Sequence, residues 1–412
     1  MIFVMVFSPG LLSPDSKTIY SQALQHQYND HHPPLMGYVW HYLNYAVKGP
    51  LLMHLINIAL IWSCIYLLAF KIFIKNKYFH IYCLCIPLIP HVACYAGFIW
   101  KDLIFTYGYG LISAYFSLKT IKSERISPTI SVFGLILLFY CTSVKYQAQF
   151  ILPLLIFWYF SIQSHFKLLK SLLITIPISV LFIFSIYKVN ENLINTHGQG
   201  SSNSWKYVKI YDLSGMSLHE KKILVPKEFH RKKLILKNIQ EKYSLEWESL
   251  IVEKDSPFKS PNTKEDLFLI QKAWKDAVLK HPLSYLKHRS HIWYNGIILG
   301  VPGKGWLDEN LGKENFISKH IVPLGILTAF IFLIPFQILF FFIGYKGARQ
   351  KETRGYGRSL LFMSSMGVTL LMILFIFSLA AVPRYIYFTN YMFMISLPFA
   401  AQIVFQKKNK KA

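Results

Sequence analysis

The chain alternates long apolar runs with short polar turns over most of its length. Several runs contain roughly 17–25 residues, the length that an α-helix needs to cross about 30 Å of hydrocarbon. A buried core helix of a soluble domain would be shorter and would present a polar face. The pattern predicts about ten spanning helices, near residues 2–12, 51–70, 79–99, 103–118, 129–143, 148–162, 168–187, 320–344, 359–380 and 385–405.

The first of these runs is shorter than the others. Residues 2–12 are too few to span a bilayer comfortably. They carry no basic segment and no small-residue cleavage site, so they do not have the pattern of a signal peptide. We expect either that this helix is stretched at the membrane surface or that the true start of the protein lies upstream of Met1.

Basic residues follow every second helix from the second one onward. They lie within residues 71–77, 119–125, 167–170, 346–358 and 407–411. Cytoplasmic loops are enriched in Lys and Arg, and all five sites fall on one side if the helices alternate. We therefore expect a multi-pass protein of the cell membrane, namely a bacterial plasma membrane, with both termini in the cytoplasm.

These helices divide the chain into three parts. Residues 1–187 form an N-terminal transmembrane module whose first outer loop is 13–50, and residues 320–412 form the C-terminal transmembrane helices. Between them, residues 188–319 are polar and lysine-rich, and apolar positions at helical spacing predict a helix over 264–292 that Pro282 interrupts. The predicted fold is an all-α polytopic membrane protein with a largely helical domain on its outer face.

Composition agrees with this class. Hydrophobic residues make up 53% of the 412, and charged residues 16%, against about 25% in an ordinary soluble domain. The net charge of +24 would suggest nucleic acid in a soluble protein, but no nucleic-acid motif accompanies it. We therefore expect a lipid bilayer around the chain and no nucleic-acid partner. The five cysteines lie in or beside apolar runs and predict no disulfide framework.

Acids and histidines gather in the first outer loop. Asp15 follows the first helix at a predicted helix start, and Asp30, His31 and His32 come about four helical turns later, before Pro33–Pro34. Such groups can supply a general base, a metal ligand or a clamp for an acceptor. Asp15 can equally be a helix cap and the histidines interfacial anchors. A divalent metal ion on Asp30, His31 and His32 is left open.

Other polar side chains lie at predicted outward ends of helices. Lys101 and Asp102 are either a surface ion pair or a second acid over the same cavity. Lys145 either reaches out of the membrane or binds a ligand. Arg384, next to Tyr385, either grips a phosphate or anchors the chain in an aromatic belt. All share the predicted face of the first outer loop, which favours an anionic, lipid-linked ligand.

The first outer loop resembles that of a known superfamily. Pro14–Asp15–Ser16 and the box Asp30–His31–His32–Pro33–Pro34–Leu35 resemble the GT-C superfamily of membrane glycosyltransferases. The nearest comparisons are protein O-mannosyltransferases and the aminoarabinose transferases that act on lipid A. Asp102 resembles the acid in the second outer loop of that superfamily, and Arg384–Tyr385 resembles a pair that binds the lipid phosphate.

The resemblance implies a sugar donor linked to polyprenyl phosphate and an acceptor that is a glycan, a lipid or a protein. Asp15 would deprotonate the acceptor hydroxyl, with inversion at the anomeric carbon. No cofactor is implied with certainty, because metal use varies in the superfamily. The remaining implied roles are catalytic for Asp30 and Asp102, donor phosphate and lipid binding for Lys101, Lys145, Arg384 and Tyr385, and substrate binding for His31, His32 and Arg289.

Two other functions fit a multi-spanning chain with a large outer domain. A polysaccharide polymerase or ligase of the cell envelope would rely on arginines of that domain, such as Arg289. A flippase or transporter of lipid-linked sugars would show repeat symmetry and broken helices at the membrane midplane. Pro87 and Pro90 interrupt the third predicted helix, but no matching pair occurs elsewhere.

Overall fold

The computed structural model describes residues 2–163, 168–198, 203–231, 234–244, 250–251, 255–298, 304–312, 315–321, 333–378 and 383–408. Within these residues every regular element is a helix, and extended segments pair only at isolated bridges. The predicted all-helical class is therefore confirmed for the described chain. Two compact units form, one from Met1–Ser201, Val301–Leu371 and Ile386–Ala412, the other from Ser202–Gly300 and Met372–Tyr385.

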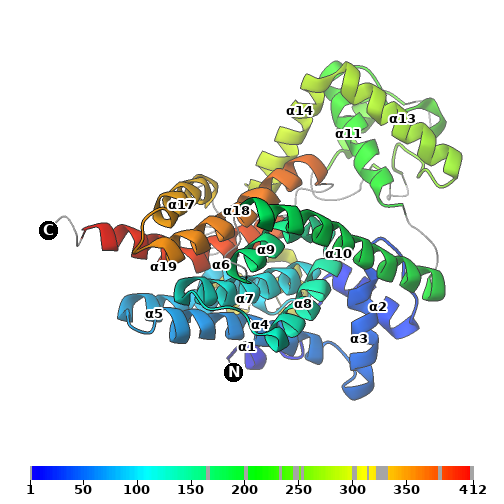
Figure 1. The fold of residues 1–412 in the computed structure, drawn as a ribbon. Coiled ribbons are helices and arrows are strands. Elements are labelled where there is room, and N and C mark those ends of the chain that lie inside the picture. The colour runs from blue at the N-terminus through cyan, green and yellow to red at the C-terminus, as the bar shows by residue number, and fades with distance from the viewer. Residues whose placement is uncertain are drawn as a thin grey trace. The chain divides into compact units, whose positions relative to one another are not determined.

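The first unit contains most of the apolar helices (Figure 1). In chain order its elements are α1 (Ile2–Phe7), α2 (Pro14–Gln25), α3 (Pro34–Ala46), α4 (Leu51–Tyr66), η1 (Leu67–Ile72), α5 (Lys77–Cys85), η2 (Ile86–Leu88), α6 (Pro90–Ala96), α7 (Lys101–Lys122), α8 (Pro128–Ser143), α9 (Ala148–Gln163), α10 (Leu168–His197), α15 (Lys304–Leu311), η5 (Ile317–Ile321), α17 (Leu333–Ala348), most of α18 (Arg354–Phe377) and α19 (Tyr387–Lys408).

Helix α7 is central to this unit. It packs against α4, α8, α9 and α19, and Figure 1 shows α4, α7 and α8 running side by side. The contact with α8 requires a residue without a side chain, because a Cβ at Gly108 would overlap the Sγ of Cys141. Gly108 therefore sets how closely α7 and α8 approach.

Four stretches of the described chain are long and apolar enough to cross a membrane: Leu51–Ile72, Leu169–His197, Arg354–Phe377 and Arg384–Gln406. A fifth is added if Lys77–Leu88 and Pro90–Ala96, which meet at a bend of 44°, form one broken span. The ten predicted spans are not confirmed. Helices α8 and α9 are apolar but short, and α1 has only six residues. Residues 322–332 and 379–380 of two predicted spans lie outside the described residues.

The first outer loop folds as two packed helices, α2 and α3. Ser13 caps α2 through its side chain, and Pro14 occupies the first turn, where a missing N–H has no cost. The expected helix of four turns up to Asp30 is wrong, because α2 ends at Gln25 and His26 adopts a left-handed conformation with φ of 52°. Pro34 then begins α3.

The second unit is a small helical domain (Figure 1), and it has its own apolar core. Its elements are α11 (Trp205–Glu220), η3 (Lys227–Phe229), α12 (Leu236–Lys242), α13 (Lys264–Lys280), α14 (Pro282–His291), η4 (Ile292–Ile298) and most of η6 (Pro383–Ile386). The predicted break at Pro282 is confirmed. The domain begins later than residue 188, because α10 continues to His197.

Candidate functional site

The amino ends of α2 and α7 lie side by side. The segments that lead into them pair as parallel strands do, at a bridge between Leu11 and Phe98. The N–H of Leu11 donates to the carbonyl of Gly97 at 2.8 Å, and the N–H of Ile99 donates to the carbonyl of Leu11 at 3.1 Å. This pairing fixes where both helices start.

Two buried serines tie the start of α2 to the start of α7. The indole N–H of Trp100 donates to Oγ of Ser13 at 2.6 Å. Oγ of Ser16 donates to the carbonyl of Ile99 at 2.6 Å. Asp15 lies between these serines in the sequence, so its backbone position is held relative to residues 99–100.

Asp15 and Asp102 occupy equivalent positions in their helices. Each is the second residue of its helix and belongs to the first turn. Unpaired N–H groups and the helix dipole favour negative charge there. Asp15 is half-buried and Asp102 is buried.

Asp102 forms a buried ion pair with Lys145. The Nζ of Lys145 is 2.6 Å from Oδ1 of Asp102, and each side chain retains only 6% of its exposure. Lys145 lies in the turn between α8 and α9, so the pair joins that turn to the start of α7. This burial does not match two interpretations of the sequence. One is a surface ion pair of Asp102 with Lys101, and the other is a Lys145 side chain that reaches into water.

Lys101 reaches the histidine box of the first outer loop. Its Nζ is 2.6 Å from Nδ1 of His32, which is buried. An ammonium group can only donate, so Nδ1 accepts and the proton of the neutral imidazole lies on Nε2. The ring of His31, which is exposed, lies 4.6 Å from that of His32.

The backbone at Asp30 contacts the same turn as Asp102. The hydroxyl of Tyr146 donates to the carbonyl of Asp30 at 2.9 Å. Asp30 itself is half-buried. The box at residues 30–32, the start of α7 and the turn at 145–146 therefore meet.

No three His, Cys, Asp or Glu side chains within the described ranges are grouped as metal ligands would be. Nδ1 of His32 is in contact with Lys101. The metal ion considered for Asp30, His31 and His32 stays a prediction.

Arg289 lies in the second unit and is nearly fully buried. Its Nη2 is 2.7 Å from Oδ2 of Asp212, and its Nη1 donates to the carbonyl of Ser378 at 2.6 Å. The indole N–H of Trp274 also donates to Oδ2 of Asp212, at 2.7 Å. Arg289 thus joins α14 to α11 and to the residue after α18. Its predicted contact with substrate stays a prediction.

His288 completes the surroundings of Asp212. Its Nε2 lies 3.3 Å from Oδ1 of Asp212. Burial lowers the pKa of His288, although the carboxylate opposes the shift.

Arg384 and Tyr385 also belong to the second unit. The guanidinium of Arg384 lies 5.6 Å from the centre of the Tyr385 ring and is buried. The cation–π contact holds the two side chains as a pair.

Three stacked histidines, two of them within the first outer loop, were not predicted. The ring of His26 stacks on His41 at 4.0 Å and on His197 at 4.1 Å. Burial lowers the pKa of His26, and the two neighbouring imidazoles lower it further. The stack joins α2, α3 and the end of α10, elements too far apart in the sequence for spacing to reveal it.

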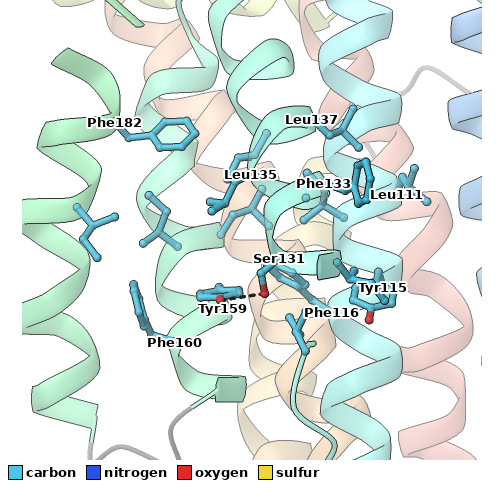
Figure 2. A pocket seen from close by; sticks show the side chains of 18 of the residues that line it. Leu111, Tyr115, Phe116, Ser131, Phe133, Leu135, Leu137, Tyr159, Phe160 and Phe182 are labelled. Atoms are coloured by element: carbon cyan, nitrogen blue, oxygen red, sulfur yellow. Dashed lines mark hydrogen bonds between the residues drawn. The ribbon is translucent and has the colours of Figure 1, made fainter. Parts of the chain in front are cut away.

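An apolar cavity of about 500 Å³ lies between α7, α8, α9 and α10. Figure 2 shows Phe133, Phe160 and Phe182 around it, with the hydroxyl of Tyr159 bonded to Ser131. Its wall is almost wholly hydrocarbon, so it suits an apolar chain. Sequence reasoning missed it, because an apolar run does not reveal where neighbouring helices leave space.

No protein-family model, no curated protein and no solved structure matches the chain.

Proposed function

We propose that the chain is a membrane glycosyltransferase of the GT-C type. It moves a sugar from a polyprenyl-phosphate donor to an acceptor hydroxyl on the outer face of the cell membrane, with inversion. The observation that carries this proposal is the side-by-side start of α2 and α7, each with an aspartate as its second residue. Lys101 and Lys145 lie within the same group of contacts.

Asp15 is the proposed base. Its carboxylate takes the proton of the acceptor hydroxyl while the acceptor oxygen attacks the anomeric carbon. The bond between that carbon and the phosphate oxygen breaks, and the phosphate leaves with the electron pair. A single displacement of this kind inverts the anomeric centre. The half-buried position of Asp15 in the first turn of α2 suits a charged group that must still reach a substrate.

The leaving phosphate gains negative charge as the bond breaks. Lys101 and the amino ends of α2 and α7 would stabilise that charge. Asp102 holds Lys145 at the same place, so that the second lysine can contribute positive potential without moving. Asp30 and the histidine box would shape the sugar site. Binding of the lipid phosphate by Arg384 and Tyr385, which belong to the second unit, stays a prediction.

The apolar cavity supports a donor with a long hydrocarbon chain. Leu111, Ile112, Tyr115 and Phe116 of α7 line it. Lys101 is ten residues before Leu111, or about 15 Å along a helix axis. The proposal includes about ten spans, with cytoplasmic termini and α7 beginning at the outer surface.

The proposal is tested by changing the base. Cell-envelope glycans and glycoproteins are compared by mass spectrometry in cells without the gene and in cells carrying the wild type, Asp15→Asn or Asp276→Asn. Asp276 is an exposed acid on α13 and serves as the matched control. We expect a product that depends on the gene, a fall of at least about 100-fold with Asp15→Asn, and no change with Asp276→Asn. Full product formation by Asp15→Asn would overturn the assignment of the base.

A further inference from the structure

A second cavity, of about 430 Å³, opens along α2 and the residues that follow it. Its volume lies in the range of about 300–1,000 Å³ that small-molecule sites occupy. Most of its wall consists of hydroxyl and carboxamide side chains, namely Thr18, Ser21, Gln22, Gln25, Gln27 and Asn29. This wall is unlike that of the hydrocarbon-lined cavity between α7, α8, α9 and α10.

The chemistry of the wall selects a class of ligand. Carboxamides and hydroxyls both donate and accept hydrogen bonds, as the hydroxyl groups of a sugar do. Among the described residues that line the cavity, Lys17 alone is charged, and its Nζ lies 2.6 Å from a carboxylate oxygen of Glu309. The wall therefore offers no surplus charge to an ionic ligand and no large apolar surface to a lipid chain.

Tyr28 also lines the cavity, but its side chain is only 1% exposed. Its ring packs edge-on against the rings of Tyr38 and His197. The ring is therefore buried in the protein, and the hydroxyl and carboxamide side chains are the groups that the wall offers to a ligand.

The cavity adjoins the proposed catalytic residues. Asp15 stands three residues before Thr18 and seven before Gln22, the spacing of one helix face. At the other end, Asn29 precedes Asp30, and its Oδ1 accepts from the N–H of His31 at 3.1 Å. The cavity is thus lined from Lys17, two residues after the proposed base, to Asn29, the residue before Asp30.

We infer that this cavity binds the acceptor, and that the acceptor is an uncharged carbohydrate chain with a hydroxyl presented to Asp15. The role of this carbohydrate as the acceptor rests on the proposed function. The sugar-binding property itself does not depend on transfer and can be measured separately.

The test measures binding without catalysis. Purified full-length protein in detergent is examined by saturation-transfer NMR and by titration with neutral tetrasaccharides of mannose, glucose and N-acetylglucosamine, and with a serine-rich peptide. We expect at least one tetrasaccharide to bind the wild type. Gln25→Leu should weaken that binding by about tenfold, the effect of one lost hydrogen bond. Gln240→Leu, an exposed glutamine on α12, is the matched control and should bind as the wild type does.

The outcomes separate the two proposals. If no tetrasaccharide binds, or if Gln25→Leu binds as well as the control, the inference fails while the glycosyltransferase proposal stands. If the peptide binds in place of the sugars, the acceptor class is a protein and the inference is overturned. If sugars bind and Gln25→Leu weakens them, but cells without the gene lack no glycan, the cavity binds sugar and the proposed function fails.

Discussion

Asp102 and Lys145 carry opposite charges that are almost wholly removed from water. Removing one partner of such a pair leaves the other buried and uncompensated, which destabilises a protein by about 3–5 kcal/mol. We expect Asp102→Asn and Lys145→Met each to lower the thermal stability of the purified protein in detergent. The double variant should lose less than the sum of the two, because neither charge is then left alone. Additive losses would show that the two side chains do not stabilise each other.

The residues of the candidate site could be predicted more easily than their partners. Asp15 and Asp102 stand at the edges of apolar runs, where helices start, and both occupy such positions in the structure. The pairing of Asp102 with Lys145 depends on α8 running back along α7, and no local pattern encodes that. The contact of Lys101 with His32 has the same origin, since it joins segments 69 residues apart.

At the scale of elements, α7 and α8 offer a matched pair of glycines. A Cβ at Gly108 would overlap Cys141, whereas nothing lies within 4 Å of a Cβ at Gly134 in α8. Both are helical, so an alanine gains helix propensity of about 1 kcal/mol at either place. We expect Gly108→Ala to lower the melting temperature in detergent and Gly134→Ala to leave it unchanged or raise it. Equal effects would mean that α7 and α8 do not pack as described.

The apolar runs in the sequence predicted where helices lie, but they did not always predict where the helices end. Runs at 129–143 and 148–162 correspond closely to Pro128–Ser143 and Ala148–Gln163, because polar residues bound them. Helix α10 extends to His197, past the apolar run, and Lys188 pairs there with Glu191 at 2.7 Å across one turn. The end of α2 was missed because His26, not glycine, adopts the left-handed conformation.

At the scale of the whole molecule, the distribution of basic residues predicts which loops face the cytoplasm. In a variant whose native cysteines are replaced by serine, we expect Asp276→Cys to react with a membrane-impermeant maleimide in intact cells. Lys75→Cys, in the turn before α5, should react only after the membrane is permeabilised. We expect this difference in labelling because cytoplasmic loops are enriched in Lys and Arg. Labelling of Lys75→Cys in intact cells would reverse the proposed orientation.

The division into units could be predicted only in part. A polar stretch between two apolar regions indicated a separate helical domain, and residues 203–298 supply nearly all of its described elements. The first unit, however, takes residues from both ends of the chain, and α19 packs against α7 within it. Hydropathy identifies candidate spans but not which of them are neighbours.

The parallel pairing of Leu11 with Phe98 is made by main-chain groups, and the adjoining bonds come from Ser13 and Ser16. None of these contacts uses a carboxylate. The scaffold that aligns the two helix starts is therefore chemically separate from the groups proposed to react. An inert Asp15 variant that keeps this scaffold could hold donor and acceptor together without turnover, and so serve as bait for capturing both natural ligands from a membrane extract.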